Sequence, residues 1–126
     1  MILFLTQDLM IASAASSHAR DAGHKFKYVA NVDRVLHFIQ KGNEADAAPE
    51  AKVELLLVDL QTPEFTLDAY NQTLADTALP PTFCFAQHVL VDLLRSARES
   101  KFDQVLTRGQ FNGALPTMIA SIGNPS

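Results

Sequence analysis

The chain has 126 residues, the size of one domain, with a net charge of −4 from 14 acidic and 10 basic residues. The basic residues are scattered along the sequence, which argues against a nucleic-acid partner. No apolar run approaches the roughly 18 residues of a membrane span, and the N-terminus lacks the basic flank of a signal peptide, so we expect a cytoplasmic protein without membrane contact. The single cysteine, Cys84, allows no internal disulfide.

Five short apolar runs have the length of β-strands and alternate with longer segments of helical period. They cover residues 2–5, 26–30, 53–58, 82–86 and 104–107. The first and third runs are continuous rather than alternating, which is typical of strands covered by helices on both faces. We therefore expect these two strands at the centre of a sheet.

The segments that follow the apolar runs predict five helices. The first four cover residues 9–22, residues 32–43, a stretch from just after Pro63 through Leu74, and residues 88–100. Gly23 is expected to cap the first helix in a left-handed conformation. The fifth helix is expected to be short and to start at residue 114 or 115, because Pro116 has no N–H to donate inside a helix.

This alternation predicts an α/β fold of one domain over residues 1–126. The expected sheet is parallel and doubly wound, with strand order 2-1-3-4-5 and helices on both faces. In that order the first and third strands are neighbours, and the winding of the chain reverses between them. Ligand sites in such sheets lie at this reversal, outside the carboxyl ends of the strands.

Three charged residues follow strands that end at this edge: Asp8, Asp59 and Arg108. Two nearby carboxylates repel each other unless a cation lies between them, and Mg²⁺ would suit such oxygen ligands. Each residue also has an ordinary explanation, as a helix cap for Asp8, a turn acid for Asp59 and a solvated side chain for Arg108. Only their expected convergence favours a site.

Other site chemistries lack a sequence pattern. His18, His24, His37 and His88 have no metal-ligand spacing with one another or with Cys84. The sequence contains no glycine-rich phosphate-binding loop and no serine nucleophile elbow. We therefore expect neither a nucleotide cofactor nor serine hydrolase chemistry.

Over nearly its whole length the chain resembles a response-regulator receiver domain of two-component signalling. The segment VDLQTP matches the family's phosphoacceptor segment, in which an aspartate is followed four residues later by a proline, here Asp59 and Pro63. PPTFCFAQ resembles the family's proline-led fourth strand, and ESKFDQVLTRGQF resembles the segment of its fifth strand. The separation of Ala86 from Arg108 leaves the intervening helix at the family's usual length.

The resemblance implies a flavodoxin-like fold, with Asp59 at the phosphoacceptor position. It also implies a Mg²⁺ site made by Asp8, Asp59 and the backbone carbonyl of Gln61. Receivers carry two adjacent acids after the first strand, and Gln7 stands at one of these positions. The resemblance therefore implies a weakened affinity for Mg²⁺, because a glutamine oxygen is a neutral ligand.

Further departures fall on the positions that handle and read the phosphoryl group. Ala86 stands where the family has a hydroxyl residue, and Arg108 and Gly109 stand where it has lysine and proline. Val105 stands at the position of the aromatic switch residue. An arginine keeps the positive charge of the lysine but replaces a compact ammonium with a planar fork.

These departures favour a non-enzymatic pseudo-receiver, a protein-binding module of phosphorelay signalling with weak or absent phosphorylation at Asp59. The alternatives are a slow Mg²⁺-dependent phosphoacceptor with Asp59 as nucleophile and a flavodoxin-like domain that binds a small ligand. The expected partner is a histidine kinase or a downstream signalling protein. A homodimer would use the face of the fourth helix, fifth strand and fifth helix, where Val89 and Val91 are expected to be partly exposed.

Overall fold

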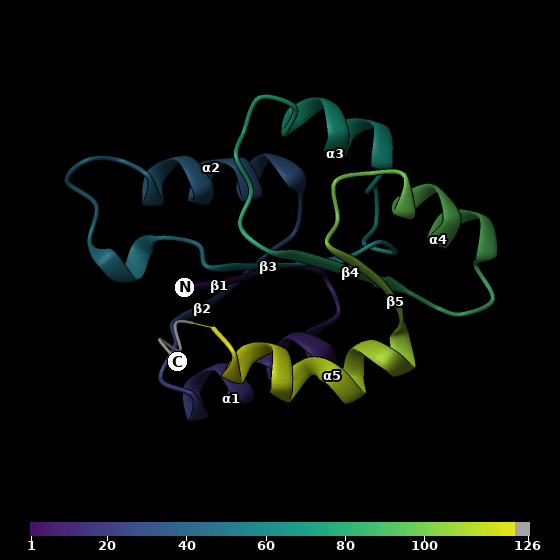
Figure 1. The fold of residues 1–126 in the computed structure, drawn as a ribbon, viewed down its shortest axis with the longest axis horizontal. Coiled ribbons are helices and arrows are strands. Elements are labelled where there is room, and N and C mark those ends of the chain that lie inside the picture. The colour runs from purple at the N-terminus through teal and green to yellow at the C-terminus, as the bar shows by residue number, and fades with distance from the viewer. Residues whose placement is uncertain (123–126) are drawn as a thin grey trace.

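The computed structural model describes residues 1–122 as a five-stranded parallel sheet between two layers of helices (Figure 1). The strand order is β2-β1-β3-β4-β5, which confirms the predicted order. The strands are β1 (Ile2–Leu5), β2 (Phe26–Val29), β3 (Leu55–Asp59), β4 (Thr82–Ala86) and β5 (Gln104–Thr107).

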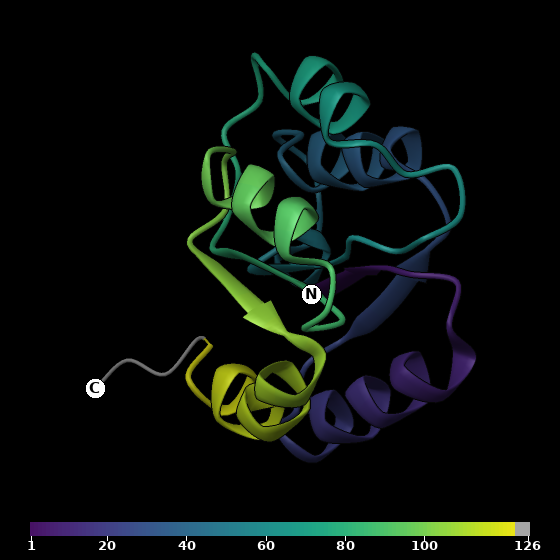
Figure 2. The same ribbon diagram turned by 90° about the vertical axis from the view of Figure 1, so that its right-hand side faces the viewer.

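The helices cover both faces of the sheet, as Figures 1 and 2 show. One layer holds α1 (Leu9–Asp21) and α5 (Arg108–Ala120), and the other holds α2 (Val32–Gly42), α3 (Leu67–Thr73) and α4 (Val91–Arg98). A short 3₁₀ helix, η1 (Pro49–Ala51), lies between α2 and β3. Within residues 1–122, no helix has both the length and the apolar character that a membrane crossing requires.

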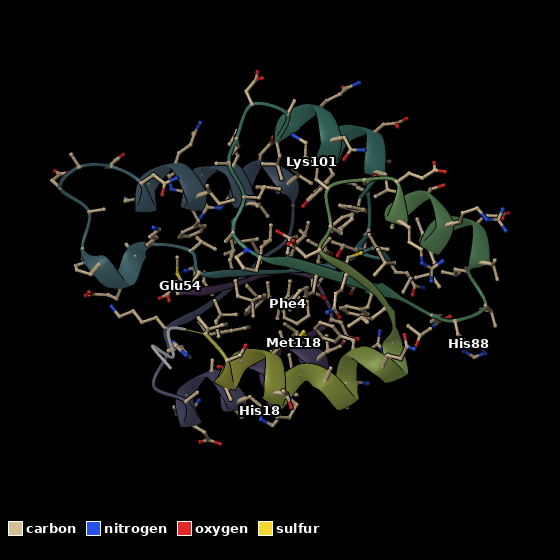
Figure 3. The ribbon with its side chains drawn as sticks, in the orientation of Figure 1. Phe4, His18, Glu54, His88, Lys101 and Met118 are labelled. Atoms are coloured by element: carbon tan, nitrogen blue, oxygen red, sulfur yellow. The ribbon has the colours of Figure 1, made fainter. Side chains whose placement is uncertain are left out.

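The two central strands are buried on both faces, as their continuous apolar sequence predicts. Alternate side chains of β1 enter different cores. Ile2 and Phe4 pack toward α1 and α5, while Leu3 and Leu5 pack toward α2, α3 and α4. Figure 3 shows Phe4 beneath the sheet on the side of α5. Full burial of such side chains contributes roughly 1.5 to 3 kcal/mol each to folding.

Small side chains bring α1 close to the sheet. Ala12, Ala15 and Ala19 are all buried at three- and four-residue spacing. The helix ends where Gly23 takes a φ of +80°, a conformation that glycine adopts without strain, so the predicted cap is confirmed.

The fifth helix differs from its prediction, because it begins at Arg108 and carries Pro116 in its interior. Thr107 and Gln110 form a capping box that fixes the earlier start. Phe111 and Leu115 are buried and hold the helix against the sheet, while Pro116 is exposed. Tertiary burial therefore outweighs the hydrogen bond that the proline cannot make.

Some other boundaries also differ from the sequence predictions. The fourth helix begins at Val91, because the preceding residues form a turn closed by a hydrogen bond from the Leu90 N–H to the Gln87 carbonyl. The third helix starts only at Leu67, where the Thr66 side chain caps it. Cys84, in the middle of β4, is fully buried.

Candidate functional site

Asp59 is the last residue of β3, and only 4% of it is exposed. Both of its carboxylate oxygens accept a hydrogen bond within the protein. Oδ2 accepts from the Thr6 hydroxyl at 2.9 Å, and Oδ1 accepts from the Gln61 backbone N–H at 3.0 Å. A buried carboxylate needs such donors, because losing its water is costly unless they are replaced.

Thr6 is the functional residue that the sequence reasoning missed. It directly follows β1, is only 1% exposed, and contacts Asp59 from the neighbouring strand. Its hydroxyl also accepts a hydrogen bond from the Asp8 backbone N–H at 3.1 Å. Since β1 ends at Leu5, the two residues directly after the strand are Thr6 and Gln7 rather than Gln7 and Asp8.

Asp8 is the N-cap of α1, with its Oδ1 accepting from the backbone N–H groups of Met10 and Ile11. Its Oδ2 accepts from Arg108 Nη2 at 2.6 Å. The hydrogen bond from Arg108 is the main reason that the pKa of Asp8 lies below its ordinary value. The Thr6 hydroxyl connects the two acids, because it donates to Asp59 Oδ2 and accepts from the Asp8 backbone N–H.

Arg108 reaches one of the two acids, as expected, but that acid is Asp8. Its guanidinium also lies 5.9 Å from the centroid of the Phe85 ring. Arg108 opens α5, where a positive charge opposes the helix dipole, and the Asp8 carboxylate offsets that charge. The pair ties the start of α1 to the start of α5.

Two glutamines near Asp59 make connections between loops. Gln7 is exposed, and its Nε2 donates to the Ala30 carbonyl at 3.3 Å, at the end of β2. Gln61 Oε1 accepts from the Gln87 N–H at 2.8 Å, which links the loop after β3 to the loop after β4. Both side-chain amides are therefore used to hold loops in place.

Comparison with known proteins gives structural matches alone: no protein-family model and no curated protein matches the sequence. The chemotaxis response regulator CheY4 of Vibrio cholerae is 13% identical, with a TM-score of 0.71 and coverage of 94% of this chain and 93% of that one. The receiver domain of NtrX from Brucella abortus is 15% identical, with a TM-score of 0.65 and the same coverage.

A response-regulator receiver protein from Burkholderia phymatum is 16% identical, with a TM-score of 0.66 and coverage of 99% and 98%. The chain has the receiver-domain fold. One structure with this fold, the response regulator Rcp1, is described in its Mn²⁺-bound form. It is 14% identical, with a TM-score of 0.65 and coverage of 94% and 88%. At these identities the likeness concerns the fold.

In this receiver fold, Ala86 closes β4 in a fully buried position and brings no hydroxyl to the site. Its neighbour Phe85 pairs with Asp59 across the β3–β4 ladder. Val105 lies half-buried in β5 and packs against the core on the side of α2, α3 and α4. His88 projects outward beyond the end of β4, as Figure 3 shows.

The residues of this receiver fold do not fit a divalent cation at Asp59. Within residues 1–122, no group of three or more His, Cys, Asp or Glu side chains is arranged to hold a metal ion. Both oxygens of Asp59 already accept hydrogen bonds, and Asp8 is held by its helix and by Arg108. Mg²⁺ requires near-octahedral oxygen ligands, so a cation here would have to displace these contacts.

Proposed function

We propose that this chain is a pseudo-receiver, a protein-binding module of two-component phosphorelay signalling with weak or absent phosphorylation at Asp59. The hydrogen bond from the Thr6 hydroxyl to Asp59 Oδ2 carries the proposal. It supplies a donor where phosphoryl chemistry would need a metal ion and an open approach to the carboxylate. The partner would be a histidine kinase or a downstream signalling protein.

The surroundings of Asp59 also support low reactivity. A carboxylate attacks phosphorus with an oxygen lone pair, while the charge that develops on the phosphoryl oxygens needs positioned donors. Asp59 is only 4% exposed, and each oxygen is engaged. Ala86 contributes no hydroxyl, and a hydrogen bond to a charged group is typically worth about 1.5 to 3 kcal/mol.

The side chains that would change position in response to phosphorylation are also missing. A switch needs an element with two arrangements of similar energy, one of which is favoured by the phosphoryl group. Ala86 is fully buried and has no group that could follow a phosphate. Val105 of β5 already packs against the core and has no ring to swing inward. Binding to a partner therefore does not depend on phosphorylation in this proposal.

The second candidate is a slow phosphoacceptor, favoured by the cation that Arg108 places beside the site. In this case Asp59 is the nucleophile, Asp8 becomes the metal ligand and Arg108 stabilises the phosphoryl charge. Arg108 would first have to release Asp8, to which it donates at 2.6 Å. That requirement is why we place this function second.

The deciding experiment is to incubate the protein with Mg²⁺ and acetyl phosphate and to measure its intact mass. We expect no phosphate adduct on the wild-type chain, because Asp59 is buried and both of its oxygens are bonded. An adduct that disappears in Asp59→Asn would contradict the pseudo-receiver and support the second candidate. Calorimetric titration with Mg²⁺ measures metal affinity on the same samples.

A reverted variant gives this experiment a positive arm. Thr6→Asp places a second carboxylate beside Asp59, and Ala86→Thr returns a hydroxyl to the end of β4. We expect the double variant to bind Mg²⁺ more tightly than the wild type and to form an adduct. If neither property appeared in a folded double variant, Thr6 and Ala86 would not account for the low reactivity.

A further inference from the structure

A groove of about 750 Å³ runs between α1 and strand β2, away from the Asp59 site. Residues 26–30 form one wall. The other wall is one face of α1, from Leu9 to Arg20, and Arg34 of α2 also lines the groove. In Figure 1, α1 lies below β2 and α2 lies above it.

The wall of the groove is an open sheet edge, because β2 pairs with β1 alone within the described part of the chain. The Lys25 and Val29 carbonyls face β1 and accept hydrogen bonds from backbone N–H groups on that side. Since backbone groups alternate in direction along a strand, the N–H and C=O groups of Phe26 and Tyr28 face outward. Such a row of unpaired groups is a template for another strand.

Three basic side chains gather along the groove. Arg20, Lys27 and Arg34 line it and are exposed. Among residues 1–122, none of the three makes a salt bridge, although the chain as a whole carries a net charge of −4. A local cluster of this kind attracts an anionic partner and raises its association rate.

These cations lie on both sides of the sheet edge, which indicates the shape of the occupant. Lys27 Nζ and Arg34 Cζ lie 5.6 and 5.2 Å from the Phe38 ring centroid, on the side of α2. Arg20 belongs to α1 on the opposite side. A small anion in the groove would reach one side, whereas an added strand presents alternate side chains to both.

We propose that an acidic, extended segment of a partner protein binds here by adding a sixth strand to β2. Its backbone pairs with Phe26 and Tyr28, and its carboxylates alternate between Arg20 on one side and Lys27 with Arg34 on the other. Tyr28, which is 47% exposed, supplies apolar contact beside the added strand. The inference rests on the proposed role as a protein-binding module and names the chemistry of its partner.

The test uses a capped, fluorescein-labelled peptide of about eight residues in which pairs of adjacent glutamates alternate with pairs of valines, so that glutamates face both sides of the added strand. Fluorescence anisotropy measures its affinity, and ¹⁵N NMR locates it on the full chain. We expect saturable binding, with amide shifts confined to residues 26–30, the facing side of α1 and the start of α2 around Arg34. Hydrogen exchange at the amides of Phe26 and Tyr28 should slow when the peptide binds, because these groups gain partners.

Charge-reversal and backbone controls separate strand addition from simple charge attraction. Lys27→Glu with Arg34→Glu is expected to weaken binding by about tenfold or more. Arg98→Glu, an exposed change on α4, should leave affinity unchanged. A peptide N-methylated at alternate residues keeps its charge but cannot pair, so it should also bind at least about tenfold more weakly.

Three results would each overturn the inference. The first is that the peptide does not bind, and the second is that the N-methylated peptide binds equally well. The third is that the amides of residues 26–30 shift with protein concentration in the absence of peptide, which would assign the edge to a second copy of the chain. Phosphorylation plays no part in these measurements. A phosphate adduct together with peptide binding would overturn the pseudo-receiver proposal and leave strand addition at β2 standing. Failed peptide binding without an adduct would overturn strand addition at β2 and leave the pseudo-receiver proposal standing.

Discussion

Thr6 illustrates how a single hydroxyl can satisfy the hydrogen-bonding needs of a buried acid. Its donated hydrogen bond, together with the Gln61 N–H, keeps the Asp59 carboxylate satisfied without solvent. The same hydroxyl accepts from the Asp8 N–H, so it joins the ends of β1 and β3 to the start of α1. Thr6 therefore holds the ends of two strands and the start of a helix together around Asp59.

Thr6→Val keeps the shape of this side chain and removes its hydroxyl. It should lower the free energy of unfolding by about 1 to 3 kcal/mol, because Asp59 Oδ2 loses its donor in a buried position. Thr62→Val is the matched control, since the Thr62 hydroxyl is also buried but donates to backbone carbonyls. Urea unfolding at pH 7 measures both, and an equal or smaller loss for Thr6→Val would contradict this role.

The pair of Asp8 and Arg108 should make stability depend on pH. Because the pKa of Asp8 is lowered in the folded state, its stabilising effect is full above about pH 4 and is lost as pH falls through that lower value. Asp8→Asn keeps the helix cap but removes the charge. With the side chain of Asp8 34% exposed, we expect a loss of at most about 1 kcal/mol at pH 7.

The measurement compares urea unfolding of the wild type and Asp8→Asn at pH 7 and at pH 3. The difference between the two proteins should shrink at the lower pH, where the wild-type carboxylate begins to take up a proton. High salt at pH 7 should reduce it too, because the pair is partly exposed. A difference that grows on acidification would exclude the ion pair as its source.

Among the helices, α5 combines a strong start with a weak interior. The capping box of Thr107 and Gln110 satisfies its first turn, while Pro116 leaves one carbonyl in the preceding turn without its helical partner. Buried Phe111 and Leu115 compensate for this defect by packing under the sheet. The helix is thus held by its contacts with the rest of the fold.

Replacing the exposed Pro116 with alanine should stabilise the protein by about 2 to 2.6 kcal/mol. The new N–H completes the helix, where proline costs about 3 kcal/mol relative to alanine, and the freer unfolded chain cancels roughly 0.4 to 1 kcal/mol of that gain. Pro49→Ala is the control, because Pro49 begins η1, where proline is tolerated. Urea unfolding should show a gain for Pro116→Ala and none for Pro49→Ala.

Across the whole molecule, the sequence predicted the sheet better than it predicted the site. Continuous apolar runs such as Ile2–Leu5 identify central strands, because burial on both faces leaves little room for polar side chains. Thr6 escaped notice since a β-branched residue after such a run fits a strand equally well. The contact of Arg108 with Asp8 joins residues 100 positions apart, and no local pattern reports which acid an arginine will choose.

Cys84 is a native chemical probe of how fast the sheet opens. The thiol lies in β4 between β3 and β5, and burial raises its pKa to about 12, so at pH 8 it is neither exposed nor ionised. Iodoacetamide should therefore label it only when the sheet opens. Labelling followed by mass spectrometry should give a rate equal to the unfolding rate at high reagent concentration, whereas rapid labelling of the native protein would contradict this.

Labelling measured in this way would time the opening of the sheet without any added probe. The two hydrophobic cores share a single sheet, so neither can be exposed far without disturbing the strand that carries the thiol. A partner that holds the sheet together, at either edge, would lower the labelling rate of Cys84 in proportion to its occupancy. The labelling rate of this one native cysteine therefore reports the binding of any partner that stabilises the folded state.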